Sequence, residues 1–268
     1  MSIKRTNLPF RALMTLALIL LIKSSVCGQD SASLKALESP RMRALITSEG
    51  LVSVTDPEDI YHADIVSRRV PWGGINIVCR QDKGAWTEKQ LSGGKVITYS
   101  EKSFSLLTDE NDIPVSVVRN FSLCGEKLDY RIEITAKDDT GVEIGDLALV
   151  MPWDITFSED PDTIFERSFT KHHFISGNGS FIYFTRPSGD PPFLMVLPHE
   201  GTGLEYFDNK GGGYNVYIHS AVAGSTVASG TWRQEHTSVN LGGNSGTDTL
   251  RYGLRIVWAD SWDSMRQL

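Results

Sequence analysis

Apolar and polar residues alternate along most of this chain with a period of two. The clearest case is KLDYRIEITA at residues 127–136, in which every second residue from Leu128 to Ile134 is apolar and the residues between them are charged. Successive side chains of a strand point to opposite faces, so this pattern is typical of an antiparallel strand buried on one face. The run PVSVVRNFSL at residues 114–123 precedes it, and the tripeptide CGE lies between them. Two such runs with a short Gly-containing loop predict a hairpin.

Similar short runs recur up to residue 258, and clusters of Gly, Pro, Asn and Asp separate them. Beyond the hairpin, the predicted strands are residues 44–47, 51–54, 74–79, 96–99, 103–107, 144–150, 165–169, 180–185, 193–197, 204–207, 214–219 and 250–258. More than ten short strands with frequent turn signals predict an all-β fold, a large antiparallel β-sandwich in a single domain.

The last nine residues have the pattern of a helix start. Asp260 can accept hydrogen bonds from the first N–H groups, and Asp263 suits the positive end of the helix dipole. The chain ends at Leu268, about two helical turns later. Two interpretations stay open: a truncated helix that leads into a further part, and a short terminal helix docked on the sandwich.

The first 28 residues have the pattern of a secretion signal. Basic residues precede an apolar run at residues 12–22, and small residues follow it. The run is shorter than the about 20 residues that cross a bilayer. We predict a signal peptide at 1–28, a linker at 29–43, the sandwich at 44–259 and a truncated helix or linker at 260–268. The protein would then be secreted or periplasmic, and a retained anchor is the alternative.

Charge excludes some partners. The predicted signal holds four of the 26 basic residues and none of the 33 acidic ones, which leaves 22 basic residues and a net charge of −11. An acidic chain is repelled by phosphate backbones and anionic lipids, so we expect neither nucleic acid nor, after signal cleavage, a membrane as partner.

Two cysteines, Cys79 and Cys124, remain beyond the predicted signal. Export exposes them to an oxidising compartment, so they are a disulfide candidate. Two free thiols are the alternative.

The densest cluster of chemically active side chains lies between residues 165 and 197. The weak catalytic candidates are His172, His173, Glu166 and Glu205, with Glu200 and Asp208 as further carboxylates that could line a cleft. Neighbouring residues on a strand point to opposite faces, so the two histidines are not expected to share a metal ion. The sequence has no HxH, HExxH or CxxC spacing. We therefore expect no metal and no cofactor.

Tryptophans are the candidates for ligand binding. Trp72, Trp86 and Trp232 stand beside Pro, Gly or polar residues, where an exposed indole offers a flat apolar face to a sugar ring. Arg186 and Asn178, in or near a Gly-rich turn, are added as polar candidates. Core packing is the alternative for every tryptophan.

Several segments carry a family resemblance. They are HHFISGNGSFIYFTRPSGDPPFLMVLP, GLEYFD, GGGYNVYIHSA, IGDLALVMPWD and LRYGLRIVWADSWDSMRQL. From about residue 45 on, the chain resembles a family of large secreted bacterial and fungal proteins that share a domain of unknown function. Its members resemble glycosidases and phosphorylases that join an N-terminal, galactose-mutarotase-like super-β-sandwich to a C-terminal (α/α) toroid.

The resemblance implies a carbohydrate partner, an oligo- or polysaccharide, and a helical domain in cis that carries the catalytic carboxylates. Three functions stay open. The chain is an accessory sandwich that braces a missing helical domain of a glycoside hydrolase-like protein and shapes its cleft. Alternatively, it is a stand-alone carbohydrate-binding module that uses exposed tryptophans. As a third alternative, the chain is a complete enzyme with His172 or His173 as general base.

Overall fold

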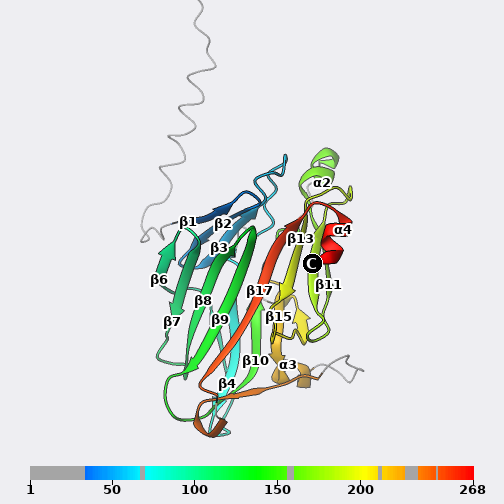
Figure 1. Cartoon of the computed structure of the whole chain (residues 1–268). Coiled ribbons are helices and arrows are strands. Elements are labelled where there is room, and N and C mark those ends of the chain that lie inside the picture. Colours follow the sequence, from blue (N-terminus) through cyan, green and yellow to red (C-terminus); the bar gives the residue numbers. More distant parts are fainter. Residues whose placement is uncertain (1–33, 67–69, 156–159, 211–212, 227–234, 246) are drawn as a thin grey trace, which may run out of the picture. The chain divides into compact units, whose positions relative to one another are not determined.

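The computed structural model describes residues 34–66, 70–155, 160–210, 213–226, 235–245 and 247–268 (Figure 1). Its strands are β1 Lys35–Ser39, β2 Met42–Thr47, β3 Gly50–Thr55, β4 Gly74–Gln81, β5 Thr87–Leu91, β6 Lys95–Ser100, β7 Ser103–Thr108, β8 Val115–Cys124, β9 Lys127–Ala136, β10 Val142–Val150, β11 Thr170–Phe174, β12 Phe181–Thr185, β13 Phe193–Pro198, β14 Tyr206–Asp208, β15 Asn215–Ser220, β16 Val239–Leu241 and β17 Thr249–Ala259. Its helices are α2 Pro161–Arg167, α3 Ala221–Thr226 and α4 Trp262–Gln267, with a 3-10 turn at Gly243–Ser245. In the part of the chain described, no helix is long and apolar enough to cross a bilayer.

The strands form three sheets, and every strand pair among the described residues is antiparallel. The largest sheet has the order β11-β12-β13-β17-β9-β8-β7-β6, and we call it the eight-stranded sheet. The six-stranded sheet has the order β14-β15-β10-β4-β5, with β16 beside β10, and β1-β2-β3 form a small third sheet. The predicted all-β antiparallel sandwich is confirmed.

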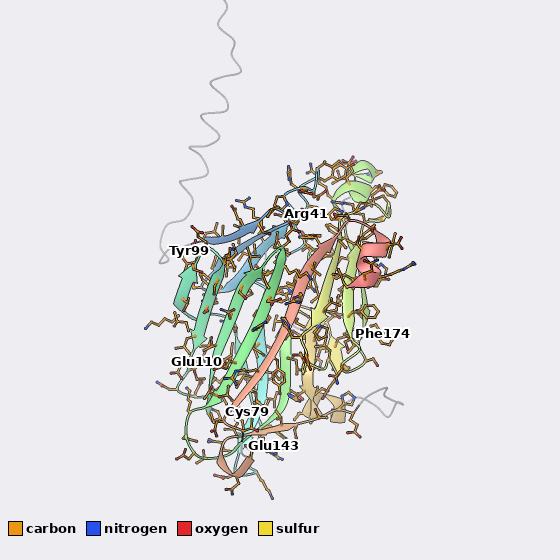
Figure 2. The ribbon with its side chains drawn as sticks, viewed as in Figure 1. Arg41, Cys79, Tyr99, Glu110, Glu143 and Phe174 are labelled. Atoms are coloured by element: carbon orange, nitrogen blue, oxygen red, sulfur yellow. The ribbon has the colours of Figure 1, made fainter. Side chains whose placement is uncertain are left out.

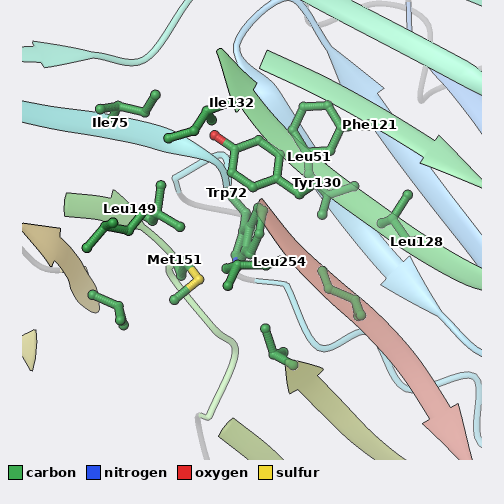
Figure 3. Close-up of a cluster of buried hydrophobic side chains, with 14 of the residues drawn as sticks. Leu51, Trp72, Ile75, Phe121, Leu128, Tyr130, Ile132, Leu149, Met151 and Leu254 are labelled. Carbon is green, nitrogen blue, oxygen red and sulfur yellow. The ribbon is translucent and has the colours of Figure 1, made fainter. Parts of the chain in front are cut away.

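The hydrophobic core joins the inner faces of the two larger sheets (Figure 3). Trp72, just before β4, is fully buried at its centre, with its ring edge-on to Tyr130 at 5.0 Å and to Trp153 at 5.6 Å. Leu149 of the six-stranded sheet and Leu254 of the eight-stranded sheet belong to the same cluster. The alternation that predicted β9 also holds, because its four apolar residues face this core.

One arginine takes the place of an apolar side chain in the core. Arg119 on β8 is fully buried, and its guanidinium donates hydrogen bonds to the carbonyls of Gly73 at 3.2 Å, Ser92 at 2.8 Å and Gly93 at 2.5 Å. Burial lowers the pKa of this guanidinium, but an arginine stays protonated in proteins. The side chain therefore fastens the eight-stranded sheet to the segments that enter β4 and leave β5.

Two predicted segments have a different structure. The predicted linker at 29–43 is, from Lys35 on, strand β1 and the start of β2, because Leu37 and Met42 are needed to cover the core. Residues 165–169 were predicted to form a strand, but residues 165–167 are the last part of helix α2, which begins at Pro161. Proline is favoured in the first turn of a helix, and here this preference outweighs the strand tendency of the short apolar run that follows. The predicted signal peptide lies outside the described residues.

The C-terminal helix starts one residue later than expected. Ser261 caps α4, since its hydroxyl accepts a hydrogen bond from the N–H of Ser264 at 3.0 Å. Asp260 instead forms an ion pair with Arg41, whose guanidinium also binds Asp56 at 2.6 Å. Met265 of α4 packs against an apolar patch on the outer face of the eight-stranded sheet. The helix is thus docked on the sandwich.

Candidate functional site

Two adjacent hollows open on the outer face of the eight-stranded sheet. The polar hollow has a volume of about 470 Å³ and is lined by residues that include Asn120, Arg131, Glu133 and Arg251 of β8, β9 and β17. The aromatic hollow has a volume of about 740 Å³ and lies between α4 and strands β12 and β13, with Phe181, Tyr183, Met195 and Trp262 in its wall. His199 and Glu200 line both hollows. The two hollows therefore adjoin at these two residues, and we call them together the recess.

The shared wall is a tight turn fixed to the middle of β17. The N–H of His199 donates to the carbonyl of Gly253 at 2.9 Å, and the N–H of Gly253 donates to the hydroxyl of Thr202 at 3.0 Å. The N–H of Thr202 closes the turn on the carbonyl of His199 at 2.9 Å. Gly201 adopts a φ of 80° inside it, a value that suits glycine. The position of His199 is thus set by main-chain hydrogen bonds to a central strand.

Glycine at position 253 is required for the imidazole to lie against the sheet. A Cβ atom there would stand 2.7 Å from Cδ2 of His199 and 2.8 Å from the carbonyl oxygen of Tyr130. Both distances are shorter than van der Waals contact. Strand β17 therefore needs a residue without a side chain at the point where the turn crosses it.

The buried carboxylate of Asp129 lies between the two hollows and pairs with the positively charged side chains around it. Asp129 accepts two hydrogen bonds from Arg255, at 2.7 and 3.0 Å, and one from Arg131 at 3.3 Å. Nε2 of His199 approaches the same carboxylate at 3.4 Å. Burial alone would raise the pKa of Asp129, but the hydrogen bonds from Arg255 and the neighbouring positive charges outweigh it and lower the pKa. Asp129 is therefore ionised at neutral pH.

The same surroundings keep His199 neutral. Burial lowers the pKa of its imidazole, and the charges of Arg131 and Arg255 add to this effect against the attraction of Asp129. A neutral imidazole has one nitrogen that donates and one that accepts a hydrogen bond. Nε2 is buried against the Asp129 carboxylate, so the nitrogen left for a ligand is Nδ1, which accepts a hydrogen bond when Nε2 carries the proton.

Cross-strand pairs form the rest of the polar hollow. Arg251 donates to Glu133 at 2.8 Å across β17 and β9. The amide of Asn120 donates to Ser103 at 3.2 Å and Ser105 at 2.7 Å. Its carbonyl oxygen remains as an acceptor. Such a surface offers several donors and acceptors in fixed positions to a ligand rich in hydroxyl groups.

The aromatic hollow is built from rings that pack on one another. The Trp262 ring lies 4.7 Å from Phe193 and 6.4 Å from Tyr183, centroid to centroid, and His172 stacks on the other side of Tyr183 at 4.6 Å. Trp262 is 43% exposed. It is thus held by other rings while part of its surface faces solvent.

Of the catalytic candidates, Glu205 lies in the interior and away from the recess. Its carboxylate accepts hydrogen bonds from the Ser220 hydroxyl at 2.7 Å and the Thr237 N–H at 2.9 Å. Thr237 in turn contacts His219 at 3.0 Å, and His219 bonds Tyr252 on the opposite sheet at 2.6 Å. Burial lowers the pKa of His219. This network ties the two large sheets together.

The remaining predicted polar residues lie at separate places. His172 and His173 point to opposite faces of β11, as expected: His172 joins the outer aromatic stack, and His173 packs on Phe207 at 4.1 Å. The carbonyl of Glu166 accepts a hydrogen bond from Arg186 at 2.5 Å. Arg186 was expected to be accessible to a ligand, which is wrong: its guanidinium is buried on Asp59 at 2.5 Å.

The structure describes two of the three tryptophans of the predicted platform. Trp72 was expected to be exposed, and this is wrong because the core encloses its ring on all sides. Trp86 is half-buried beside β5, with Arg80 over its ring at 4.0 Å. Trp232 lies outside the described residues. Asn178 is exposed and lines the aromatic hollow, so it is the one polar candidate from the Gly-rich turn that reaches the recess.

The two cysteines are free. Cys79 is buried on β4 of the six-stranded sheet, and Cys124 is exposed at the end of β8 on the eight-stranded sheet. Figure 2 labels Cys79 and, beside it in the lower part of the fold, Glu143 of β10. The disulfide that the sequence left open does not form, since Cys79 lies in the core and Cys124 at the surface.

Apart from Glu200 and Asn178, the residues that build the recess were not singled out by the sequence. Asp129 pairs with Arg255 across 126 positions of sequence, and the pairing of β9 with β17 brings them together. Within the described residues, no group of three or more His, Cys, Asp or Glu side chains is placed to hold a metal ion.

Comparisons with known proteins identify the fold. Residues 55–240 match a family of unknown function, DUF5695. A search of the curated proteins found no match. A polysaccharide lyase superposes with a TM-score of 0.63 at 11% identity, over 87% of this chain and 33% of its own. A galactose mutarotase-like protein from Lactobacillus casei ATCC 334 gives 0.56 at 10% identity, over 85% and 100%.

A protein from Synechocystis sp. PCC 6803 also gives a TM-score of 0.56, at 12% identity, over 88% of this chain and 99% of its own. At such identities the similarity shows the fold alone, and it confirms the predicted galactose-mutarotase-like sandwich. The chain spans about a third of the length of the polysaccharide lyase.

Proposed function

The chain belongs to DUF5695, a family of unknown function, and from this premise we propose that it is a carbohydrate-binding β-sandwich, the accessory part of a secreted carbohydrate-active protein. The sugar binds in the recess on the outer face of the eight-stranded sheet. The chain reaches its place of action, outside the cell or in the periplasm, through the predicted signal peptide.

The observation that carries this proposal is the composition of the recess. A sugar ring presents hydroxyl groups at its rim and C–H groups on its faces, so it needs fixed polar partners beside an aromatic surface. Arg131, Arg251 and Glu133 supply the polar partners, and His199 adds a neutral imidazole. Trp262 supplies the aromatic surface.

The similarity to solved structures is a second argument for the proposal. One is named a polysaccharide lyase and another a galactose mutarotase-like protein. The part of the lyase that superposes on this chain is about a third of the lyase's own length. This proportion supports an accessory role in which the sandwich braces a helical domain in cis and helps to shape its cleft.

The accessory role is favoured over a complete enzyme that uses His172 or His173. These two side chains lie on opposite faces of an edge strand, and among the described residues neither forms an ion pair with a carboxylate. An imidazole that acts as a general base is usually oriented by a third group within hydrogen-bond reach. A stand-alone binding module that uses Trp72 lacks an exposed ring there.

The proposal is tested by glycan-array binding of the chain and of Arg251→Ala. A hydrogen bond to a charged group contributes about 1.5–3 kcal/mol, so we expect an affinity loss of about tenfold or more for the bound glycan. Arg80→Ala is the matched control, since Arg80 forms a cross-strand pair with Glu143 at 2.7 Å on the six-stranded sheet. An array without any bound glycan, or equal losses in both variants, would contradict the proposal.

A further inference from the structure

The aromatic hollow has features that a site for a single sugar does not need. Trp262 is exposed over 43% of its surface, while Phe193 beneath it is buried and Met265 of the same helix is seated in an apolar cluster. The Ser261 cap fixes the start of that helix. The ring is therefore held in place before any ligand arrives, which lowers the entropic cost of binding.

The two hollows also meet at a shared wall. His199 and Glu200 border both, and the turn that carries them is tied down on Gly253. A ligand in the polar hollow can therefore extend over this turn toward Trp262. One sugar ring cannot fill two hollows of about 470 and about 740 Å³, whereas a linear chain of rings can occupy both.

The charges of the recess balance one another. Arg255 is paired with Asp129 at 2.7 Å and Arg251 with Glu133 at 2.8 Å. Arg131 and Glu200 add one charge of each sign, and Arg266 of the aromatic hollow is paired with Asp263 at 3.7 Å. The lowered pKa of His199 leaves its imidazole uncharged at neutral pH. A surface without excess positive charge offers no net attraction to uronate carboxylates.

From the shared wall, the exposed ring and the balanced charges, we infer that the ligand is a neutral oligosaccharide that lies across both hollows, with one ring stacked on Trp262 and the preceding rings bonded in the polar hollow. This inference rests on the proposed function and specifies its ligand. Trp262 is a binding residue that sets the length of glycan required, and the residues of the polar hollow bind glycans of any length.

The test begins with an array of gluco-, galacto-, manno- and xylo-oligosaccharides of one to six residues, together with oligogalacturonates of the same lengths. Calorimetry then follows the best-bound series. We expect a tetrasaccharide to bind about tenfold more tightly than its monosaccharide, the free-energy equivalent of one aromatic stacking contact. Trp262→Ala should remove this gain and leave monosaccharide affinity within about twofold, and Trp262→Phe should retain most of it.

Tyr99→Ala is the matched control, because Tyr99 is an exposed aromatic residue on β6 at the far edge of the same sheet, opposite Phe174 of β11 (Figure 2). It should bind every length like the wild type. A readout independent of any variant is the indole N–H signal of Trp262 in a ¹⁵N correlation spectrum. The signal should move on addition of the tetrasaccharide and stay in place with the monosaccharide.

The outcomes separate this inference from the proposed function. An array with no bound glycan defeats both. Affinity that is independent of length, or an indole signal that both sugars move equally, overturns the inference and leaves sugar binding in the polar hollow. Tighter binding of oligogalacturonates than of neutral glycans also overturns it. If Trp262→Ala instead abolishes a dimer seen by light scattering and leaves the length dependence intact, the aromatic hollow is a protein interface and the inference is wrong.

Discussion

The substitution Gly253→Ala tests whether the turn at the centre of the recess is positioned by the strand beneath it. Alanine would place a methyl group 2.7 Å from Cδ2 of His199, 2.8 Å from the carbonyl oxygen of Tyr130 and 3.1 Å from Cγ of Arg131. The imidazole can rotate away, but the carbonyl belongs to the neighbouring strand and cannot. Either β17 separates from β9 or the turn lifts off the sheet.

The magnitude follows from two opposing effects. Overpacking at a filled site costs about 1–3 kcal/mol. Replacing glycine by alanine restricts the unfolded chain and returns about 0.4–1 kcal/mol. We expect a net loss of about 1–2 kcal/mol in the free energy of unfolding. In a domain of this size each kcal/mol lowers Tm by about 2–4 °C.

Urea denaturation and thermal melting measure the loss of stability, and calorimetry with the best array glycan measures the effect on binding. The affinity should fall with the stability, because His199 and Glu200 border both hollows. Gly141→Ala is the matched control, since the atom nearest to its added Cβ is 4.0 Å away. A Gly253→Ala protein with wild-type stability and wild-type affinity would refute the reasoning.

Three further predictions concern the body of the fold. Arg119→Met removes three hydrogen bonds to main-chain carbonyls, although Gly73 keeps the Tyr130 hydroxyl and Gly93 the Thr108 hydroxyl as donors, so it should lower the free energy of unfolding by about 1–3 kcal/mol in urea denaturation; an unchanged free energy of unfolding would contradict the role of Arg119. The lowered pKa of Asp129 gives stability that is present above its unfolded value of about 3.9 and lost as the pH falls through the folded value. The stability difference between the wild type and Asp129→Asn should therefore shrink in acid melts from about pH 5 to pH 2, and a constant difference is the contrary result. In the folded protein, a thiol reagent should label Cys124 and leave the buried Cys79 unmodified until denaturant is added; labelling of both in the native state would show that β4 is not buried as described.

The period-two pattern was sufficient to predict the fold because each long strand has one face in the core. Leu128 and Tyr130 of β9 are fully buried where the alternation places them. The prediction was wrong at short elements with few apolar residues. β1 was taken for a linker, and α2 for part of a strand, since five to seven residues are too few to show a period.

The recess was beyond sequence reasoning for a different reason. Asp129 occupies a position that the alternation marks as solvent-facing, and yet it is buried because Arg255 and His199 cover it. Its partners come from β17 and from the turn after β13, and only the strand order β13-β17-β9 brings them together. Trp262, in turn, reaches the recess because α4 folds back onto the outer face of the sheet.

The most direct test of the account is a crystal structure of the chain with the best array glycan bound. We predict sugar density on the outer face of the eight-stranded sheet, within hydrogen-bond distance of Arg131 and Arg251 and in contact with His199. Density confined to the six-stranded sheet, for example over Trp86, would contradict the central claim.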